Sequence, residues 1–198
     1  MKRSMIAISS AAALTLAGLG FGVATQPAGA VVTTTQDGHS RVDAGHSGVV
    51  FRIMHQGIAP FYGRFNSISG SFHLANGGSM NFQIETETVD TASAGRDRHL
   101  KSPDFFNVQQ FPRATFESTS IRDNGDGTFN VTGDLTIRGE TNEISFVATK
   151  TGEGERRGGY ATGFEATVEI SRSAFGVSAL PQGLGDEVTL MIFIQGNR

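Results

Sequence analysis

The stretch FNVTGDLTIR, residues 129–138, decides the fold class, because its apolar and polar side chains alternate with a period of two. The residues between the apolar ones are polar or charged. This alternation is typical of a strand with one buried and one solvated face, as in antiparallel sheets. The apolar face consists of Phe129, Val131, Gly133, Leu135 and Ile137.

Seven further segments repeat the pattern and are separated by the Gly, Asn and Asp clusters that are typical of turns. They cover residues 48–56, 61–74, 80–89, 113–118, 144–148, 160–170 and 188–194. Eight such segments in meander order predict an all-β, eight-stranded antiparallel barrel, in which closure leaves no exposed sheet edge. A two-sheet sandwich remains the alternative, because the pattern alone does not determine closure.

Two stretches interrupt the alternation, residues 92–112 and residues 171–186. We expect a short helical segment in the first and a Gly-rich connection in the second.

The N-terminal residues have the composition of a cleaved secretory signal. Two basic residues precede an uncharged run from Met5 to Val23, and Ala28 and Ala30 lie where a signal peptidase would cut. An uncleaved anchor is the alternative, since the run approaches the roughly 20 residues of a membrane span. Cleavage would give a periplasmic or secreted product with no stable membrane insertion. The expected organisation is a signal peptide at 1–30, a flexible segment at 31–40 and a barrel at 41–198.

Composition excludes several classes of function. The chain contains no Cys, which rules out disulfides and thiol chemistry, so the fold must rest on its hydrophobic core and backbone hydrogen bonds. Sixteen Lys and Arg against nineteen Asp and Glu give a formal charge of −3 without any block of like charges. Nucleic acid is therefore not an expected partner.

The interior of the expected barrel is rich in phenylalanine. Fifteen Phe occur in the chain, with no Trp, and many fall on the inward face of the strands. An eight-stranded barrel is just wide enough to be filled by side chains or to hold one small ligand. Small inward residues such as Gly133 and Ala148 favour space between the rings, but a packed core and a lined tunnel both remain open.

No catalytic or metal-binding motif is complete. The five His residues do not occur at the spacings of zinc motifs, so no metal site is expected. The run GHSG, residues 45–48, resembles a nucleophile elbow, but Val49 replaces the final Gly of that motif. We expect no catalytic residues, and the enzyme alternative is a lipid- or ester-processing activity with His99 or His55 as the base.

A polar cluster lies inside the first irregular stretch and consists of Arg96, Asp97 and His99, with Arg98 between them. At a barrel mouth these side chains could bind the polar head of a lipid, and an Arg could hold a phosphate. Alternatively, Asp97 caps a short helix and pairs with a neighbouring Arg to hold a lid over the barrel end. The structural role is favoured, since ion pairs within loops are common.

Eight short motifs, taken in order, resemble the YceI-like family over residues 41–195. Any one of them alone is weak, whereas the ordered set is specific. One departure is Ala174, where the family commonly has Asp. The motifs are HSGVVFRIMH (46–55), GRF (63–65), VDT (89–91), RDRHLKSPDFF (96–106), FP (111–112), GDLTIRGET (133–141), SRSAFG (171–176) and GDEV (185–188).

The resemblance implies a lipocalin-like periplasmic barrel that binds a polyisoprenoid or a similar long-chain amphiphile without catalysis. The implied ligand is an isoprenoid quinone, a prenyl phosphate or a fatty-chain lipid, and no other cofactor is expected. Arg96, Asp97 and His99 are the head-group candidates. A homodimer through an exposed barrel end is compatible with the sequence, although no patch demands one. Strand parity and the resemblance together predict a tail channel formed by Phe51, Ile53, Phe65, Phe72, Phe82, Ile84, Phe105, Phe106, Phe116, Leu135, Phe146, Phe164 and Phe175.

Overall fold

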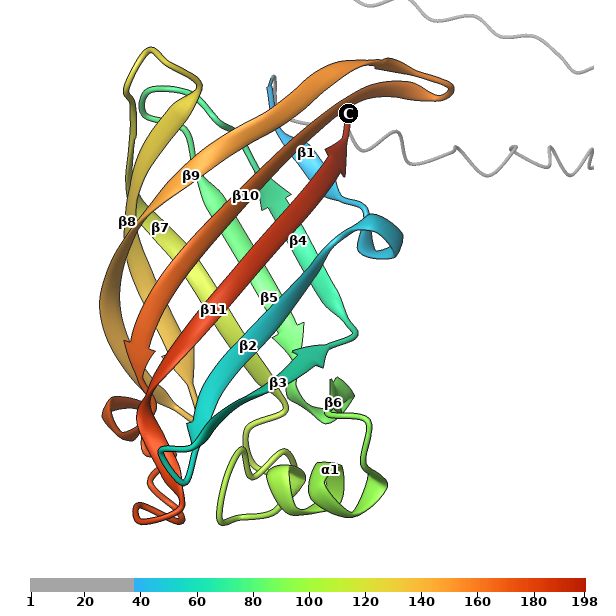
Figure 1. Cartoon of the computed structure of the whole chain (residues 1–198). Coiled ribbons are helices and arrows are strands. Elements are labelled where there is room, and N and C mark those ends of the chain that lie inside the picture. Colours follow the sequence, from blue (N-terminus) through green and yellow to red (C-terminus); the bar gives the residue numbers. More distant parts are fainter. Residues whose placement is uncertain (1–37) are drawn as a thin grey trace, which may run out of the picture. The chain divides into compact units, whose positions relative to one another are not determined.

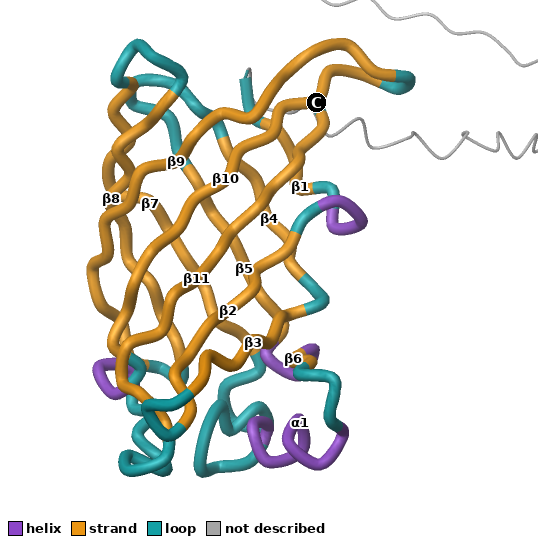
Figure 2. The backbone as a smooth tube through the Cα atoms, in the orientation of Figure 1, coloured by secondary structure: helices purple, strands orange, loops and turns teal. Residues whose placement is uncertain are grey.

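The computed structural model describes residues 38–198, so the expected signal peptide and residues 31–37 lie outside the described residues. The described chain is a tilted antiparallel barrel with one short helix below it (Figure 1). Figure 2 shows that the helix and the 3-10 turns lie at the ends of the strands or at their breaks. The elements are β1 (Ser40–Val42), η1 (Ala44–His46), β2 (Gly48–His55), β3 (Ala59–Phe65), β4 (Ile68–Phe72), β5 (Met80–Glu85), η2 (Thr86–Thr88), β6 (Val89–Asp90), α1 (Ala94–Lys101), β7 (Arg113–Asp123), β8 (Thr128–Ile137), β9 (Glu140–Arg156), β10 (Gly159–Ser171), η3 (Ser173–Phe175) and β11 (Leu184–Asn197).

The sheet closes on itself through the pairing of β1 with β11, in which Arg41 lies opposite Asn197. Strand β11 also pairs with β2, so β1 and β2 are two parts of one position in the barrel. Similarly, β3 pairs with β2 and β6, whereas β4 pairs with β1 and β5. Strands β3 and β4 therefore share a second position, and β5 and β6 share a third. The eleven strands therefore occupy eight barrel positions, which confirms the predicted closed eight-stranded barrel and its short helix.

The expected strand over residues 80–89 is interrupted, because a 3-10 turn follows Glu85. The Thr88 hydroxyl stabilises this turn: it donates to the Glu85 carbonyl at 2.7 Å and accepts from the backbone N–H groups of Asn66 and Ser67. The turn lets the same chain segment pair first with β4 and then, as β6, with β3.

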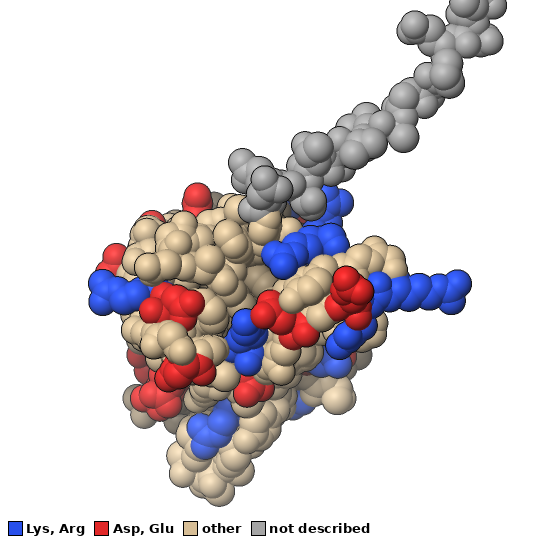
Figure 3. Space-filling model, turned by 90° about the horizontal axis from the view of Figure 1, so that it is seen from above, with Lys and Arg blue, Asp and Glu red and all other residues tan. Residues whose placement is uncertain are grey.

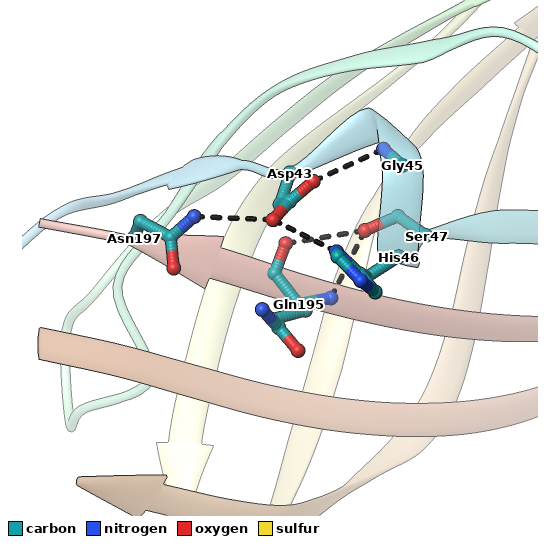
Figure 4. Close-up of polar contacts among 6 residues, drawn as sticks. All are labelled: Asp43, Gly45, His46, Ser47, Gln195 and Asn197. Carbon is teal, nitrogen blue, oxygen red and sulfur yellow. Dashed lines mark hydrogen bonds and ion pairs between the residues drawn. The ribbon is translucent and has the colours of Figure 1, made fainter. Parts of the chain in front are cut away.

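The break between β1 and β2 is held by side chains that replace strand pairing (Figure 4). The Asp43 carboxylate accepts hydrogen bonds from Gly45 N at 3.0 Å and from His46 Nδ1 at 3.0 Å. The His46 contact is the main cause of a lowered Asp43 pKa. The Ser47 hydroxyl donates to the Gln195 carbonyl and accepts from the Gln195 N–H. The GHSG run is thus a structural break, and its serine hydroxyl is engaged by backbone.

The small inward residues accommodate aromatic rings, contrary to the expectation that they leave space. A Cβ atom at Gly133 would lie 2.6 Å from Cζ of Phe116, and one at Gly63 would lie 2.2 Å from Cζ of Phe51. Each glycine therefore lets an aromatic ring from the neighbouring strand lie close against the glycine backbone.

Four buried phenylalanines, which we call the aromatic plug, pack in the barrel interior outside the cavity lining: Phe72, Phe82, Phe116 and Phe164. The ring centroids of Phe72 and Phe164 are 5.1 Å apart in an edge-to-face arrangement, and that of Phe82 lies 6.2 Å from Phe164. Phe116 is directly opposite Phe82 on the neighbouring strand. Such contacts between aromatic rings add to the stability that burial alone provides.

Candidate functional site

An apolar cavity of about 290 Å³ lies between the aromatic plug and the α1 end of the barrel. Its wall comes from β2 along most of its length, from one end each of β8 and β11, and from the two irregular stretches that the sequence shows. The volume is close to the lower end of the roughly 300–1,000 Å³ that is usual for ligand pockets. The cavity is partly open to the outside.

The structure brings together eight of the thirteen residues proposed for the tail channel. Parity identifies the face of a strand that points inward but not the height along the barrel, so five others lie elsewhere. Phe146 is half-buried beside Phe116, at a centroid distance of 5.5 Å, and the remaining four form the aromatic plug. The eight that line the cavity are Phe51, Ile53, Phe65, Ile84, Phe105, Phe106, Leu135 and Phe175.

Sequence reasoning missed much of the wall. The irregular stretch 171–186 gave a weak signal, since it contains Val177, Leu180 and Leu184, and all three line the cavity. The lining residues outside the proposed channel and head group are Val49, His55, Phe61, Thr86, Leu100, Ala114, Ile137, Ile170, Arg172, Val177, Leu180, Leu184, Val188 and Leu190.

Of the three head-group candidates, Arg96 and His99 line the cavity and Asp97 does not. Asp97 instead accepts from the backbone N–H and the hydroxyl of Thr91, at 2.9 and 2.5 Å. Arg96 donates to the Thr91 hydroxyl at 2.8 Å and its carbonyl at 2.6 Å, and its guanidinium lies 4.2 Å from the centroid of Phe61. Asp97 therefore holds α1 to the end of β6, and its partner is a threonine rather than the expected neighbouring arginine.

His99 lies at the rim of the cavity with an exposed ring. Its Nε2 is 3.3 Å from a carboxylate oxygen of Asp104, and its ring packs edge-on against Phe105 at a centroid distance of 4.9 Å. Arg96 and His99 thus add two polar groups to a mostly apolar lining, which also includes the exposed His55.

The loop after α1 is fastened to the barrel by Arg138. Its Nη1 donates to the carbonyl of Pro103 at 2.7 Å and to that of Phe105. Arg138 has a φ of 53° in the two-residue turn between β8 and β9, where Asn or Gly is usually preferred. A strained arginine at this position points to a use for its side chain, which here connects the cavity wall to the hairpin.

We expect Arg138→Asn to loosen this loop while leaving the barrel intact, because Asn tolerates the left-handed backbone. Hydrogen exchange at the amides of Phe105 and Phe106 should rise about tenfold, which corresponds to a loss of about 1.4 kcal/mol of local stability. Arg122→Asn, at an exposed position, is the control. Unchanged exchange at both amides in the Arg138 variant would contradict the role of the arginine.

The second irregular stretch is organised around Arg172, whose side chain is buried at 7% exposure in the cavity wall. Its guanidinium donates to the carbonyls of Val177, Ala179, Leu184 and Gly185 at 2.6 to 3.2 Å. Four carbonyls that a loop could not pair internally are thereby satisfied. One arginine thus shapes the apolar wall on this side of the cavity.

Asp186 closes the base of the same loop. Its carboxylate accepts from the Ser171 hydroxyl at 2.6 Å and from the Ser173 N–H at 3.1 Å. The Ser171 contact is the main cause of a pKa below the ordinary value of 3.8. Next to this loop, the Asn142 side-chain amide donates to the backbone carbonyl of Ala174 at 3.0 Å.

The lowered Asp186 pKa predicts an acid-sensitive loop. Because the folded-state pKa lies below that of the unfolded chain, the stabilisation is complete above pH 3.8 and is lost as the pH falls through the folded-state value. Urea unfolding of the wild type and of Asp186→Asn should therefore differ near about pH 6 and converge in strong acid. A difference in unfolding free energy that persists below both the folded-state and the unfolded-state pKa of Asp186 would argue against this carboxylate as the cause.

Charged groups do not form a single-sign surface at the barrel end opposite α1. Figure 3 shows Lys and Arg side chains interspersed with Asp and Glu there. Among residues 38–198, no three His, Asp or Glu side chains lie close enough to hold a metal ion. No helix in that part of the chain has the length and apolar character needed to cross a membrane.

The fold and the cavity define the class: an antiparallel, lipocalin-like β-barrel with an apolar internal cavity at one end. The YceI-like domain family matches residues 41–195, and the chain belongs to this family. A UPF0312 protein of Yersinia pestis (strain Pestoides F) is 37% identical over 187 residues, which are 92% of this chain and 96% of the relative.

Solved structures share the barrel. The crystal structure of Burkholderia cenocepacia BcnA matches with a TM-score of 0.72 and 26% identity over 79% of this chain and 99% of that one. A polyisoprenoid binding domain from Saccharophagus degradans, implicated in plant cell wall breakdown, matches with a TM-score of 0.65 over 81% of this chain and 98% of that one. Its identity is 13%, so this second likeness concerns the fold alone.

Proposed function

We propose that this protein is a noncatalytic carrier that encloses the apolar tail of an isoprenoid or fatty-chain amphiphile in the cavity at the α1 end. The observation that carries the proposal is the cavity of about 290 Å³, whose wall is apolar apart from a few polar side chains, among them Arg96 and His99 at the rim. The polyisoprenoid-binding domain of the same fold supports this class of ligand.

The energetics favour a tail over a compact polar ligand. Each methylene that leaves water contributes about 0.8 kcal/mol, so a tail of roughly ten carbons gains about 8 kcal/mol before the costs of association are subtracted. Buried polar groups, in contrast, would find few partners on this wall and would lose hydrogen bonds to water.

The head group is proposed to lie at the opening. Arg96 already donates to Thr91 through Nε and Nη2, which leaves the Nη1 group of its guanidinium for an anionic or carbonyl oxygen. A prenyl phosphate, a quinone or a fatty carboxylate would present such an oxygen next to Arg96 and His99. Asp97 has no part in the proposed head-group site, since it binds Thr91.

The proposed site of action is the periplasm or the outside of the cell, in keeping with the signal-like residues 1–30. A homodimer stays a prediction, as does the absence of any further cofactor.

Native mass spectrometry of protein purified without detergent, followed by lipid extraction, tests the proposal. We expect a bound amphiphile, or stoichiometric uptake of an added prenyl alcohol or fatty acid. Empty protein that takes up neither would overturn it. His99→Ala separates a carrier from an enzyme: a carrier keeps most of its tail affinity, whereas an enzyme that uses His99 as a base loses turnover.

A further inference from the structure

The cavity ends where the aromatic plug begins, and this boundary can be followed along the strands. On β5, Ile84 lines the cavity and the next inward residue, Phe82, belongs to the plug. On β7, the lining residue Ala114 is followed by Phe116. Since inward positions repeat every second residue, the two rings form the next layer of the barrel directly above the cavity.

The layer is closed because the neighbouring strand β8 makes room for the Phe116 ring. Gly133 lies on β8 opposite Ser118, and a Cβ there would meet the Phe116 ring at 2.6 Å. Behind Phe82 stand Phe72 and Phe164, both 1% exposed, at centroid distances of 6.4 and 6.2 Å. A tail that enters from the α1 end therefore meets two layers of packed rings.

The volume sets how much of a tail fits below the plug. An apolar cavity of about 150 Å³ holds one benzene molecule, which has six carbons. By this scale the cavity of about 290 Å³ encloses roughly a dozen carbons, or two to three isoprene units. A longer tail would have to displace the rings or leave its remaining carbons outside.

We propose that the aromatic plug, led by Phe82 and Phe116, determines the length of tail that this protein selects, with an enclosed limit of about twelve carbons. The inference rests on the proposed carrier function and adds its specificity. Below the limit each methylene enters the apolar cavity, and above it each methylene stays in water.

The test is calorimetric binding of saturated fatty acids of roughly 8 to 20 carbons, which share one head group, below their micelle concentrations. For the wild type, affinity should rise up to about fourfold per methylene and level off near twelve carbons. In Phe82→Ala the chain length at which affinity levels off should increase by about six carbons, because a phenyl ring has been removed. Phe82→Leu, a milder change, should increase this chain length by less. It replaces the alanine variant in the test if that variant does not fold.

Phe129→Ala is the matched control, since Phe129 is 3% exposed but belongs to neither the cavity wall nor the plug. In this variant, affinity should level off at the same chain length as in the wild type. A wild-type affinity that climbs steadily to the longest chain, or an equal shift in the control, would overturn the proposal while the carrier function stands. Failure of the wild type to bind any of these fatty acids, together with failure to take up an added prenyl alcohol, would instead remove the carrier function.

Discussion

Replacement of Arg172 by methionine is expected to lower the free energy of unfolding by about 3–4 kcal/mol. Four carbonyls lose their donor, and each unsatisfied buried group costs about 1–3 kcal/mol, of which water recovers a part. Methionine retains much of the apolar stem, so the loss reports on the guanidinium rather than on packing. Urea denaturation followed by circular dichroism measures the change.

Tail binding should fall in the same variant, because Val177, Leu180 and Leu184 belong to the loop that the guanidinium holds and line the cavity. Arg172→Lys tests the geometry: it keeps the charge but has no planar fork, so it should recover only part of the stability. The control Arg122→Met, at an exposed position, should change stability by less than about 0.5 kcal/mol. Full stability in Arg172→Met would show that the loop does not depend on this side chain.

Phe164→Ala is expected to destabilise the barrel by about 3–5 kcal/mol, the usual cost of truncating a buried aromatic residue. Phe164 is 1% exposed and packs against both Phe72 and Phe82, so the ring leaves a void that rigid strands cannot close. Chemical denaturation measures the loss, which should appear as a lower midpoint with little change in slope.

Phe65→Ala is the informative comparison for this prediction. Phe65 is half-buried at the cavity wall, where its ring is 5.8 Å from Phe51 and 5.4 Å from Phe106. Its truncation should weaken tail binding more than it lowers stability, while Phe164→Ala should do the reverse. If the two variants lose the same free energy of unfolding and the wild type binds no lipid, the alternative of a packed structural barrel is favoured.

The site candidates show where sequence reasoning reached its limit. Alternation placed Phe51 and Phe164 on the same inward surface, but Phe51 lines the cavity and Phe164 packs within the aromatic plug. The two positions have the same periodicity, and their heights depend on the tilt and stagger of the strands, which are properties of the closed sheet. The polar cluster likewise lies in one segment of the sequence, but only the position of Thr91 in space shows that Arg96 lines the cavity while Asp97 does not.

By itself the sequence indicated the alternating segments, the apolar interior and membership of the family, because a period of two and the ordered motifs are local properties of the chain. It also indicated that residues 92–112 and 171–186 depart from the sheet. It did not show that the segments 61–74 and 80–89 are each broken into two strands. Only the tertiary structure decided that the barrel closes through β1 and β11, that Arg172 organises a loop of the cavity wall, and that Phe82 and Phe116 lie just beyond the cavity lining. These features join residues far apart in the chain, and their energies depend on contacts that no local pattern specifies.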